Sequence, residues 1–258
     1  AEVEASLAAQ KAQLSDAQRA ELVAGAATLA ERQATPDDVD LLPKVGLSDV
    51  PRDLRVPIGE RLRVKDRAMA LFGAGTNGLV YQQAVFALPA ALEHMELLPV
   101  FGATLTEIGS GQRGYAETQH LQHSICAGIT AYASVRADMD DPARCDGMFV
   151  MSSRALRGNA VALAGVLHET LAEPDYAESG RLEDLVQQMR ARRDNGITGN
   201  GHGLAMTAAA AAFAPGAALN HRLSGLRGIL ALRELDTGLE SGAEALRIRL
   251  AELAARIA

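Results

Sequence analysis

Three side chains that could ligate a metal ion lie at three-residue intervals near the middle of the chain: Glu117, His120 and His123. Zinc accepts one carboxylate and two imidazoles, and residues three apart share one side of a helix. Each three-residue step also rotates by about 60° around the helix axis, so one ion could contact two of them and would need a ligand from elsewhere. Two histidines on a solvated helix face are the simpler interpretation.

Other candidate catalytic groups lack the partners that their chemistry needs. His168 and Glu169 are not followed by a second histidine at the spacing of a zinc-protease helix, and His94 has no second ligand nearby. Cys126 follows His123 by three residues but precedes an apolar strand pattern, which favours a buried, unreactive thiol. From the residues alone, we predict no catalytic residue in this chain.

Two glycine-rich stretches could suggest ligand loops. Residues 109–114 have a loose nucleotide-binding spacing, but they follow a helical pattern rather than a strand, so they do not predict a nucleotide site. Residues 196–203 lie between two helical patterns, where a helix end followed by a tight reversal is favoured over a ligand loop.

Composition narrows the class of protein. The 258 residues are 48% hydrophobic and 22% charged, which is enough to bury a core, and the net charge is −7. An acidic chain without basic clusters predicts no nucleic-acid partner and no anionic membrane partner, and no apolar run is long enough to span a bilayer. Two cysteines do not make a disulfide framework, so we expect reduced thiols in a cytosol-like compartment.

The N-terminal part is helical in composition. The chain starts at Ala1 without a basic or apolar leader, so we expect an unsecreted segment of a longer protein. Helices are predicted over 2–13 and 16–34, the second opened by a capping box of Ser15 and Gln18. Their apolar stripe is thin, so this hairpin needs a packing partner.

The remainder predicts strands and helices in runs. Four prolines make residues 35–59 an extended connector. Predicted strands are 67–73 and 79–88, joined by a hairpin turn at Asn77-Gly78, then 128–138, whose residues alternate, and 146–153. Helical periodicity marks the following ranges: 92–98 and 102–108 as a pair divided near Pro99, then 114–126, 160–171, 182–189, 204–213, 223–235 and 246–257. We therefore predict an α+β fold, an antiparallel sheet covered by helices on one face, with domains at 1–35 (hairpin linker) and 36–258.

Several stretches resemble, in order, the presequence-protease-like zinc metallopeptidases of the pitrilysin/insulysin group. They are LLPKVGLSDVPRD (41–53), TNGLVYQQAVFAL (76–88), the region 97–130, the helix 152–171 and GNGHGLAMTAA (199–209). The positions that match family motifs are Glu107, Gly109, Tyr115, Gly128, Gly201, His202 and Gly203. One departure is Cys126-Ala127-Gly128, where relatives often carry Thr-Gly-Gly.

The resemblance implies a role without catalysis. Family members consist of four related α+β domains in two halves, joined by a helical hairpin and closing over a peptide. Their zinc lies in the first domain, on a His-x-x-Glu-His helix, whereas the matching stretch here, 87–101, lacks that motif. This chain then resembles the linker and the zinc-free third domain of an endopeptidase that degrades short unfolded peptides. It would form one wall of the peptide chamber, with the other domains of the parent chain and peptide substrates as partners, in a bacterial-type cytoplasm or an organellar matrix.

Two other functions remain open from the residues. One is a freestanding peptide-binding or oligomerising module that uses residues 1–35 as a partner helix pair. The other is a small metal-dependent enzyme built on Glu117, His120 and His123.

Overall fold

A computed structural model describes the backbone of residues 2–53, 56–89 and 91–258, and the side chains of these residues other than 2–6, 39 and 240. The chain divides into two compact units, residues 1–73 and 74–258. The predicted division into a hairpin linker, 1–35, and one α+β domain, 36–258, stays a prediction.

The first unit begins with the two predicted helices, which are confirmed. Its elements are α1 (Glu2–Gln13), α2 (Asp16–Ala34), the short 3-10 turns η1 (Val39–Leu41) and η2 (Leu47–Asp49), and the antiparallel strands β1 (Glu60–Val64) and β2 (Arg67–Leu71). The capping box at the start of α2 is present, with Ser15 and Gln18 bonding reciprocally. None of the described side chains between residues 7 and 73 is buried.

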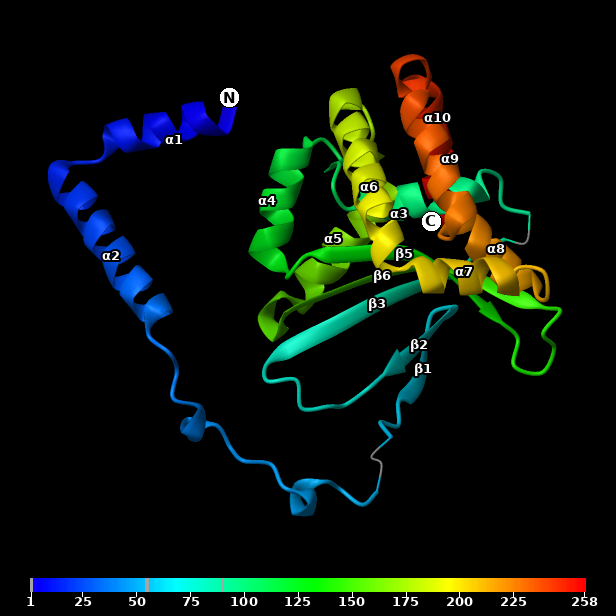
Figure 1. The fold of residues 1–258 in the computed structure, drawn as a ribbon, viewed down its shortest axis with the longest axis horizontal. Coiled ribbons are helices and arrows are strands. Elements are labelled where there is room, and N and C mark those ends of the chain that lie inside the picture. Colours follow the sequence, from blue (N-terminus) through cyan, green and yellow to red (C-terminus); the bar gives the residue numbers. More distant parts are fainter. Residues whose placement is uncertain (1, 54–55, 90) are drawn as a thin grey trace. The chain divides into compact units, whose positions relative to one another are not determined.

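The second unit is the α+β domain (Figure 1). Its strands are β3 (Leu79–Ala87), β4 (Gly109–Ser110), β5 (Ile129–Ala137), β6 (Cys145–Leu156) and β7 (Pro174–Asp175). Its helices are α3 (Leu98–Leu105), α4 (Tyr115–Ile125), α5 (Ala160–Ala172), α6 (Ser179–Gly199), α7 (Gly201–Ala210), α8 (Pro215–Leu223), α9 (Leu226–Thr237) and α10 (Leu239–Ile257), with 3-10 turns η3 (Met95–Leu97) and η4 (Arg157–Asn159).

The main sheet has β6 at its centre, paired antiparallel with β3 on one side and with β5 on the other. The alternation predicted for β5 is confirmed over its first half, because Ile129, Ala131 and Ala133 pack against the core. Helices α3 and α5 cover this face, and α6 and α10 pack behind them. At the centre, the rings of Phe101 on α3 and Phe149 on β6 lie 5.0 Å apart between centroids, tying helix to sheet.

The predicted hairpin between 67–73 and 79–88 is wrong. Strand β2 pairs with β1, whereas β3 pairs with β6. Asn77 and Gly78 do turn the chain, both with positive φ. However, β1 lies only two residues before β2 and pairs with it, and Val80 and Phe86 of β3 pack against the core beside β6.

Two helix predictions also need correction. The expected pair divided near Pro99 is the turn η3 followed by one helix, α3, because Pro99 occupies the first helical turn, where its missing N–H breaks no bond. The range 223–235 corresponds to one helix, α9, which begins at Leu226, whereas the helix before it, α8, was not predicted.

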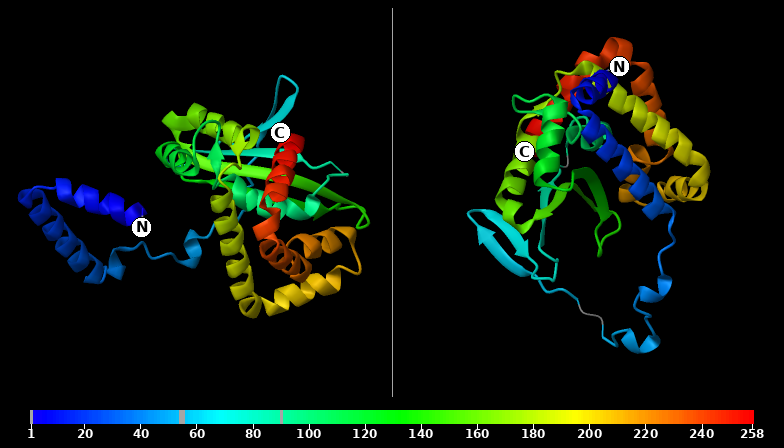
Figure 2. Two further views of the ribbon diagram at one scale, coloured as in Figure 1. Left: turned by 90° about the horizontal axis from the view of Figure 1, so that it is seen from above. Right: turned by 90° about the vertical axis from the view of Figure 1, so that its left-hand side faces the viewer.

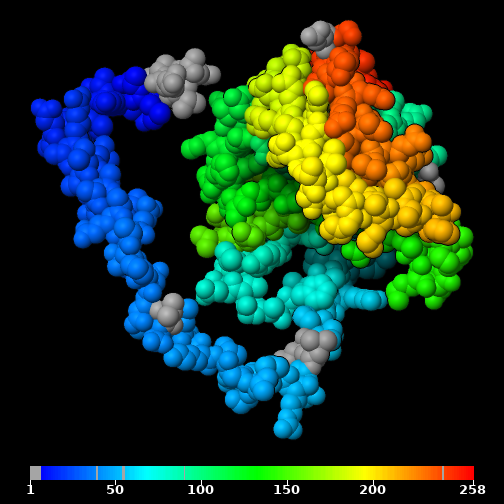
Figure 3. Space-filling model, viewed as in Figure 1, coloured from blue at the N-terminus to red at the C-terminus, as the bar shows by residue number. Residues whose placement is uncertain are grey.

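The glycine-rich stretch 196–203 is largely helical. Helix α6 continues to Gly199 and α7 begins at Gly201, and the direction changes sharply at Asn200 between them (Figure 2). The reversal uses no left-handed glycine in these residues, since Asn200 has φ −125°. Helices α6 to α9, yellow and orange, then form one continuous surface of the second unit (Figure 3).

Candidate functional site

A small hollow lies where the end of α3, helix α4 and the start of β5 meet. We call it the polar pocket; its volume is about 150 Å³. It is lined by Thr106, Glu107, Gln119, Gln122, His123, Gly128 and Ile129. Three positions singled out from the sequence, Glu107, His123 and Gly128, therefore come together here.

Glu107 is fixed by donors from two helices. Gln119 Nε2 on α4 donates to Glu107 Oε2 at 2.7 Å. Arg181 on α6 donates from Nη2 to the same oxygen at 3.0 Å and from Nε to the main-chain oxygen of Glu107 at 3.2 Å. The guanidinium thus balances the carboxylate charge at the edge of the polar pocket.

Tyr115 belongs to the same cluster. The guanidinium of Arg181 lies 4.7 Å from the centre of the Tyr115 ring, a distance at which a cation and a ring attract each other. The main-chain N–H of Tyr115 donates to Glu178 Oε1 at 2.8 Å, which satisfies a free donor at the start of α4. The first turn of α4 is therefore bound to α6 on two sides.

Gln122 is the buried polar residue of the pocket. Its side chain is only 5% exposed, and its Nε2 has no hydrogen-bond partner among the described residues. A buried amide without a partner costs stability, and most such groups in native proteins are satisfied. Gln122 Nε2 is therefore a buried donor without a partner in the described structure.

The glycine-rich loop 109–114 has a structural task. A Cβ on Gly109 would lie 2.5 Å from the main-chain oxygen of Arg113, so only glycine allows this close approach. Ser110 Oγ donates to Glu169 Oε1 at 3.0 Å, and Arg113 forms an ion pair with the same carboxylate. The loop is thereby tied to α5.

The three candidate metal ligands do not form a site. Glu117, His120 and His123 are all exposed, and His123 alone lines the polar pocket. The described residues contain no group of three His, Cys, Asp or Glu side chains able to hold a metal ion. The buried face of α4 carries Thr118 and Gln122 instead, so the predicted ligands face solvent.

Residues 201–203, the remaining motif positions, lie at the start of α7 and do not line the polar pocket. A Cβ on Gly203 would lie 2.4 Å from Asn200 Oδ1, so the Asn200 side chain fills the space beside this glycine and would have to rotate if a Cβ were added. His202 is exposed. The motif lies at the joint between α6 and α7.

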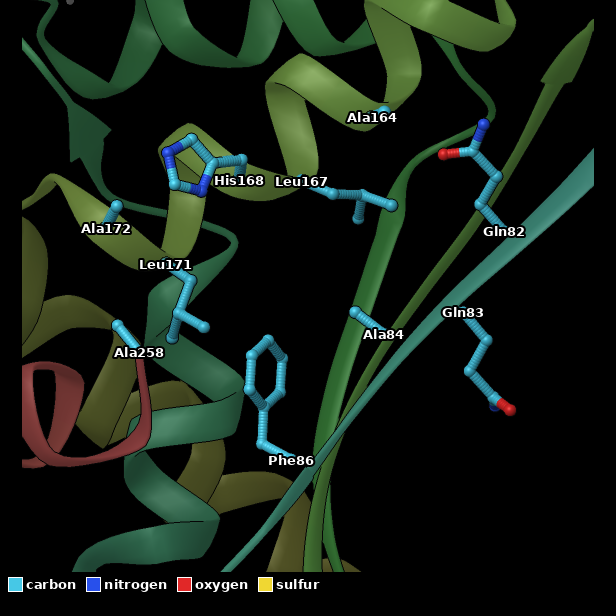
Figure 4. Close-up of a pocket in the computed structure, with 10 residues that line it drawn as sticks. All are labelled: Gln82, Gln83, Ala84, Phe86, Ala164, Leu167, His168, Leu171, Ala172 and Ala258. Atoms are coloured by element: carbon cyan, nitrogen blue, oxygen red, sulfur yellow. The ribbon is translucent and has the colours of Figure 1, made fainter. Parts of the chain in front are cut away.

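A second hollow, of about 280 Å³, lies between β3 and α5 (Figure 4). Its lining is mainly apolar: Gln82, Gln83, Ala84, Phe86, Ala164, Leu167, His168, Leu171, Ala172 and Ala258. Figure 4 shows Phe86 and Leu171 facing its interior and His168 on α5 at its edge. His168 is exposed and joins no metal-binding group of the described chain.

The sequence pattern did not single out Gln119, Gln122 or Arg181. Gln122 lies one turn after Thr118, and two polar residues at that spacing on a helix indicate solvent rather than burial. Arg181 is separated from Glu107 by 74 residues, and no local pattern predicts such a pair.

Comparison with known proteins defines the class. Residues 1–235 match the model of the family described as Peptidase M16 (subgroup C) associated, and the chain belongs to this family. It is 26% identical to presequence protease 1, chloroplastic/mitochondrial, of Arabidopsis thaliana over 94% of its length, and 27% identical to the mitochondrial presequence protease of Danio rerio over 88%. A similar protein from Yarrowia lipolytica is 25% identical over 87% of the chain.

The chain spans less than a quarter of the length of these relatives: 23% of the Arabidopsis protein and 22% of the Danio protein. The described part contains no helix with the length and apolar character needed to cross a membrane.

Proposed function

We propose that this chain is the non-catalytic wall and linker of a longer zinc metalloendopeptidase that degrades short unfolded peptides. The family match over residues 1–235 carries the proposal, since the matched relatives are named presequence proteases and are about four times longer. Their names, which say mitochondrial or chloroplastic, also support an organellar matrix as the location.

The second unit offers a surface suited to such a wall. Tyr81 and Val85 on β3 and Tyr132 on β5 are exposed on the sheet face opposite the helical layer. Val85 and Tyr132 both lie opposite Val150 in the register, so the apolar groups are adjacent. A flat face of aromatic and aliphatic side chains can contact peptides of many sequences without forming a fixed pocket.

Zinc does not fit the side chains present here. The best donor set, Glu117, His120 and His123, is solvent-exposed and forms no three-ligand group in the described chain. A catalytic zinc requires three protein ligands and one open position. In this proposal the metal belongs to the first domain of the parent, and no chemical step is assigned to this chain.

The test is peptide cleavage by the isolated chain. A quenched fluorescent peptide should stay intact with the chain alone and with added zinc, with a complete presequence protease as the positive control. Cleavage by the chain that a chelator abolishes, and that His120→Ala removes, would support the small metalloenzyme instead.

A freestanding oligomerising module is the second candidate, favoured by α2. Leu22, Val23 and Leu29 on this helix are exposed, and apolar side chains in that number favour association. Light scattering separates the two functions, because a stable dimer that Val23→Glu dissociates would favour the module, and a monomer would favour the wall.

A further inference from the structure

We propose that the free edge of β3, together with the hollow of about 280 Å³ beside it, is a binding subsite for an extended peptide. The peptide adds to the main sheet as a further strand and places one apolar side chain in this hollow, which we call the apolar pocket. The inference rests on the proposed function, and it adds a place on this chain where substrate is held.

The main-chain bonds around β3 show which of its groups are free. In the described chain β3 pairs on one side only, with β6. At one end of this pairing the N–H of Leu88 donates to the main-chain oxygen of Gly147 at 2.9 Å. At the other end the main-chain oxygen of Gly78 accepts from the N–H of Arg157 at 2.9 Å. Because the facing of main-chain groups alternates along an antiparallel pair, the even-numbered residues of β3 bond to β6.

The odd-numbered residues of β3 consequently turn their main-chain groups toward the free edge. Tyr81, Gln83 and Val85 each present one N–H and one C=O there, at the two-residue repeat of a strand. An exposed edge of this kind is a template for pairing with another extended chain. An extended peptide matches it because its own N–H and C=O groups have the same repeat.

The apolar pocket reaches this edge. Gln82, Gln83 and Ala84 all line it, although successive side chains of a strand point to opposite faces. Figure 4 shows the side chains of Gln82 and Gln83 on opposite sides of β3. Consecutive residues of a strand line one hollow when that hollow extends to the edge of the strand. A strand added at the free main-chain groups of Gln83 therefore passes beside the pocket.

The lining of the pocket suits an apolar side chain. Phe86 of β3 and Leu171 of α5 face its interior, and Leu167 lies between them and the exposed Ala164 (Figure 4). A cavity of about 150 Å³ with aliphatic and aromatic walls is enough to hold benzene. The larger volume here, about 280 Å³, therefore accepts a leucine or phenylalanine side chain.

Charge favours a peptide over a second copy of the chain as the occupant. The lining residues include no Asp, Glu, Lys or Arg, so the pocket complements an uncharged side chain. Two copies of this chain carry a net charge of −7 each and repel one another, whereas a short neutral segment meets no such repulsion. An extended peptide also has free main-chain amides, while those of folded proteins are nearly all paired. The subsite therefore selects unfolded peptides that carry an apolar side chain.

The test follows the backbone N–H signal of Gln83 in proton–nitrogen spectra of the whole chain. The probe is acetyl-Ala-Ala-Leu-Ala-Ala-amide, and we expect a saturable downfield shift of this signal because the N–H gains an acceptor. Replacing the leucine of the probe by aspartate should weaken binding by about tenfold or more, since the apolar pocket offers a carboxylate no partner.

Two N-methylated forms of the leucine probe test the strand geometry. One carries methyl groups on the nitrogens of the leucine and the last alanine, and the other on the nitrogens of the two alanines that flank the leucine. Alternate N–H groups of an added strand face the same edge. Only one of the two methylated probes should therefore bind more weakly than the parent probe, by about tenfold.

A matched pair of variants tests the pocket. Ala164→Phe fills the pocket from its exposed rim, so the leucine probe should bind about tenfold more weakly. Ala162→Phe, exposed on the same helix and outside the lining, should bind as the parent chain does. The comparisons between probes need no variant, and they decide the matter even if Ala164→Phe does not fold.

Any of five results would overturn the inference. They are no saturable shift of the Gln83 signal, equal binding of the leucine and aspartate probes, equal effects of the two methylation patterns, equal binding by the two variants, or a Gln83 shift that follows chain concentration without peptide. The last result would assign the edge to a second copy of the chain. Failure of the proposed function has a different signature, chelator-sensitive peptide cleavage by the chain itself, so the two failures are distinguishable.

Discussion

Arg181 on α6 holds Glu107 twice, donating from Nη2 to the carboxylate at 3.0 Å and from Nε to the main-chain oxygen at 3.2 Å. Because its guanidinium also lies over the ring of Tyr115, one side chain joins α6, α4 and the segment after α3. We expect Arg181→Ala to lower the free energy of unfolding by about 2 kcal/mol.

Urea denaturation measures this change. Arg192→Ala is the matched control, since Arg192 is exposed on the same helix, and its effect should stay within about 0.5 kcal/mol. Equal midpoints for the two variants would show that the Arg181 contacts add nothing to stability.

Gly102 allows α3 to lie directly on β5. A Cβ at this position would come 2.7 Å from the main-chain oxygen of Ala131, which cannot move without disturbing the sheet. Gly102→Ala should therefore destabilise the second unit by about 1–3 kcal/mol. Gly165→Ala on α5 meets no atom within 4 Å and should stabilise by up to about 1 kcal/mol. Thermal unfolding of the two variants should shift in opposite directions, and a shift of the same sign would contradict this packing.

The buried phenol of Tyr176 makes the free energy of unfolding depend on pH in the alkaline range. Burial raises the pKa of its phenol well above the ordinary value, with a smaller opposite effect from the Thr104 hydroxyl. The neutral phenol is thus favoured in the folded state. Its contribution to the free energy of unfolding is complete below about pH 10, and it falls by about 1.4 kcal/mol for each pH unit above that value.

The measurement is the urea midpoint at pH 8 and at pH 11 for the parent chain and for Tyr176→Phe. The variant should lose less stability between the two values because its ring has no proton to release. An identical loss in both chains would assign the alkaline sensitivity to other groups.

Ser15 caps α2 through its reciprocal bonds with Gln18. Ser15→Ala should cost this helix about 1 kcal/mol, seen as faster hydrogen exchange of the amides in its first turns. Thr28→Ala, in the middle of the same helix, should have the opposite effect because alanine has the higher helix propensity. An unchanged rate of amide hydrogen exchange in Ser15→Ala would mean that the cap does not limit the opening of the first turns of α2.

The sequence predicted best those elements whose pattern is local. The residues of strand β5 alternate between apolar and polar types from Ile129 to Ala133, and the capping residues of α2 are three apart, so both are visible without knowing the fold. The hairpin at Asn77-Gly78 was wrong although the turn is real, because a turn fixes direction and not the strand that pairs next.

The polar pocket was only partly predictable. Glu107 and Gly128 were found through the resemblance, but their meeting depends on α3, α4 and β5 folding together. Gln122 was not found, since nothing in a polar helix sequence indicates which glutamine is buried. That assignment requires the tertiary packing of Thr118 and Gln122 against the core.

The order of strands in the main sheet has a consequence during biosynthesis. Strand β3 ends at Ala87, yet its partner β6 begins only at Cys145. At about 5–20 residues per second, a ribosome leaves β3 unpaired for roughly 3–12 s. During that interval the apolar residues at alternating positions of β3 are exposed and can contact other nascent chains. We therefore expect the need for holdase chaperones to be greatest in this interval.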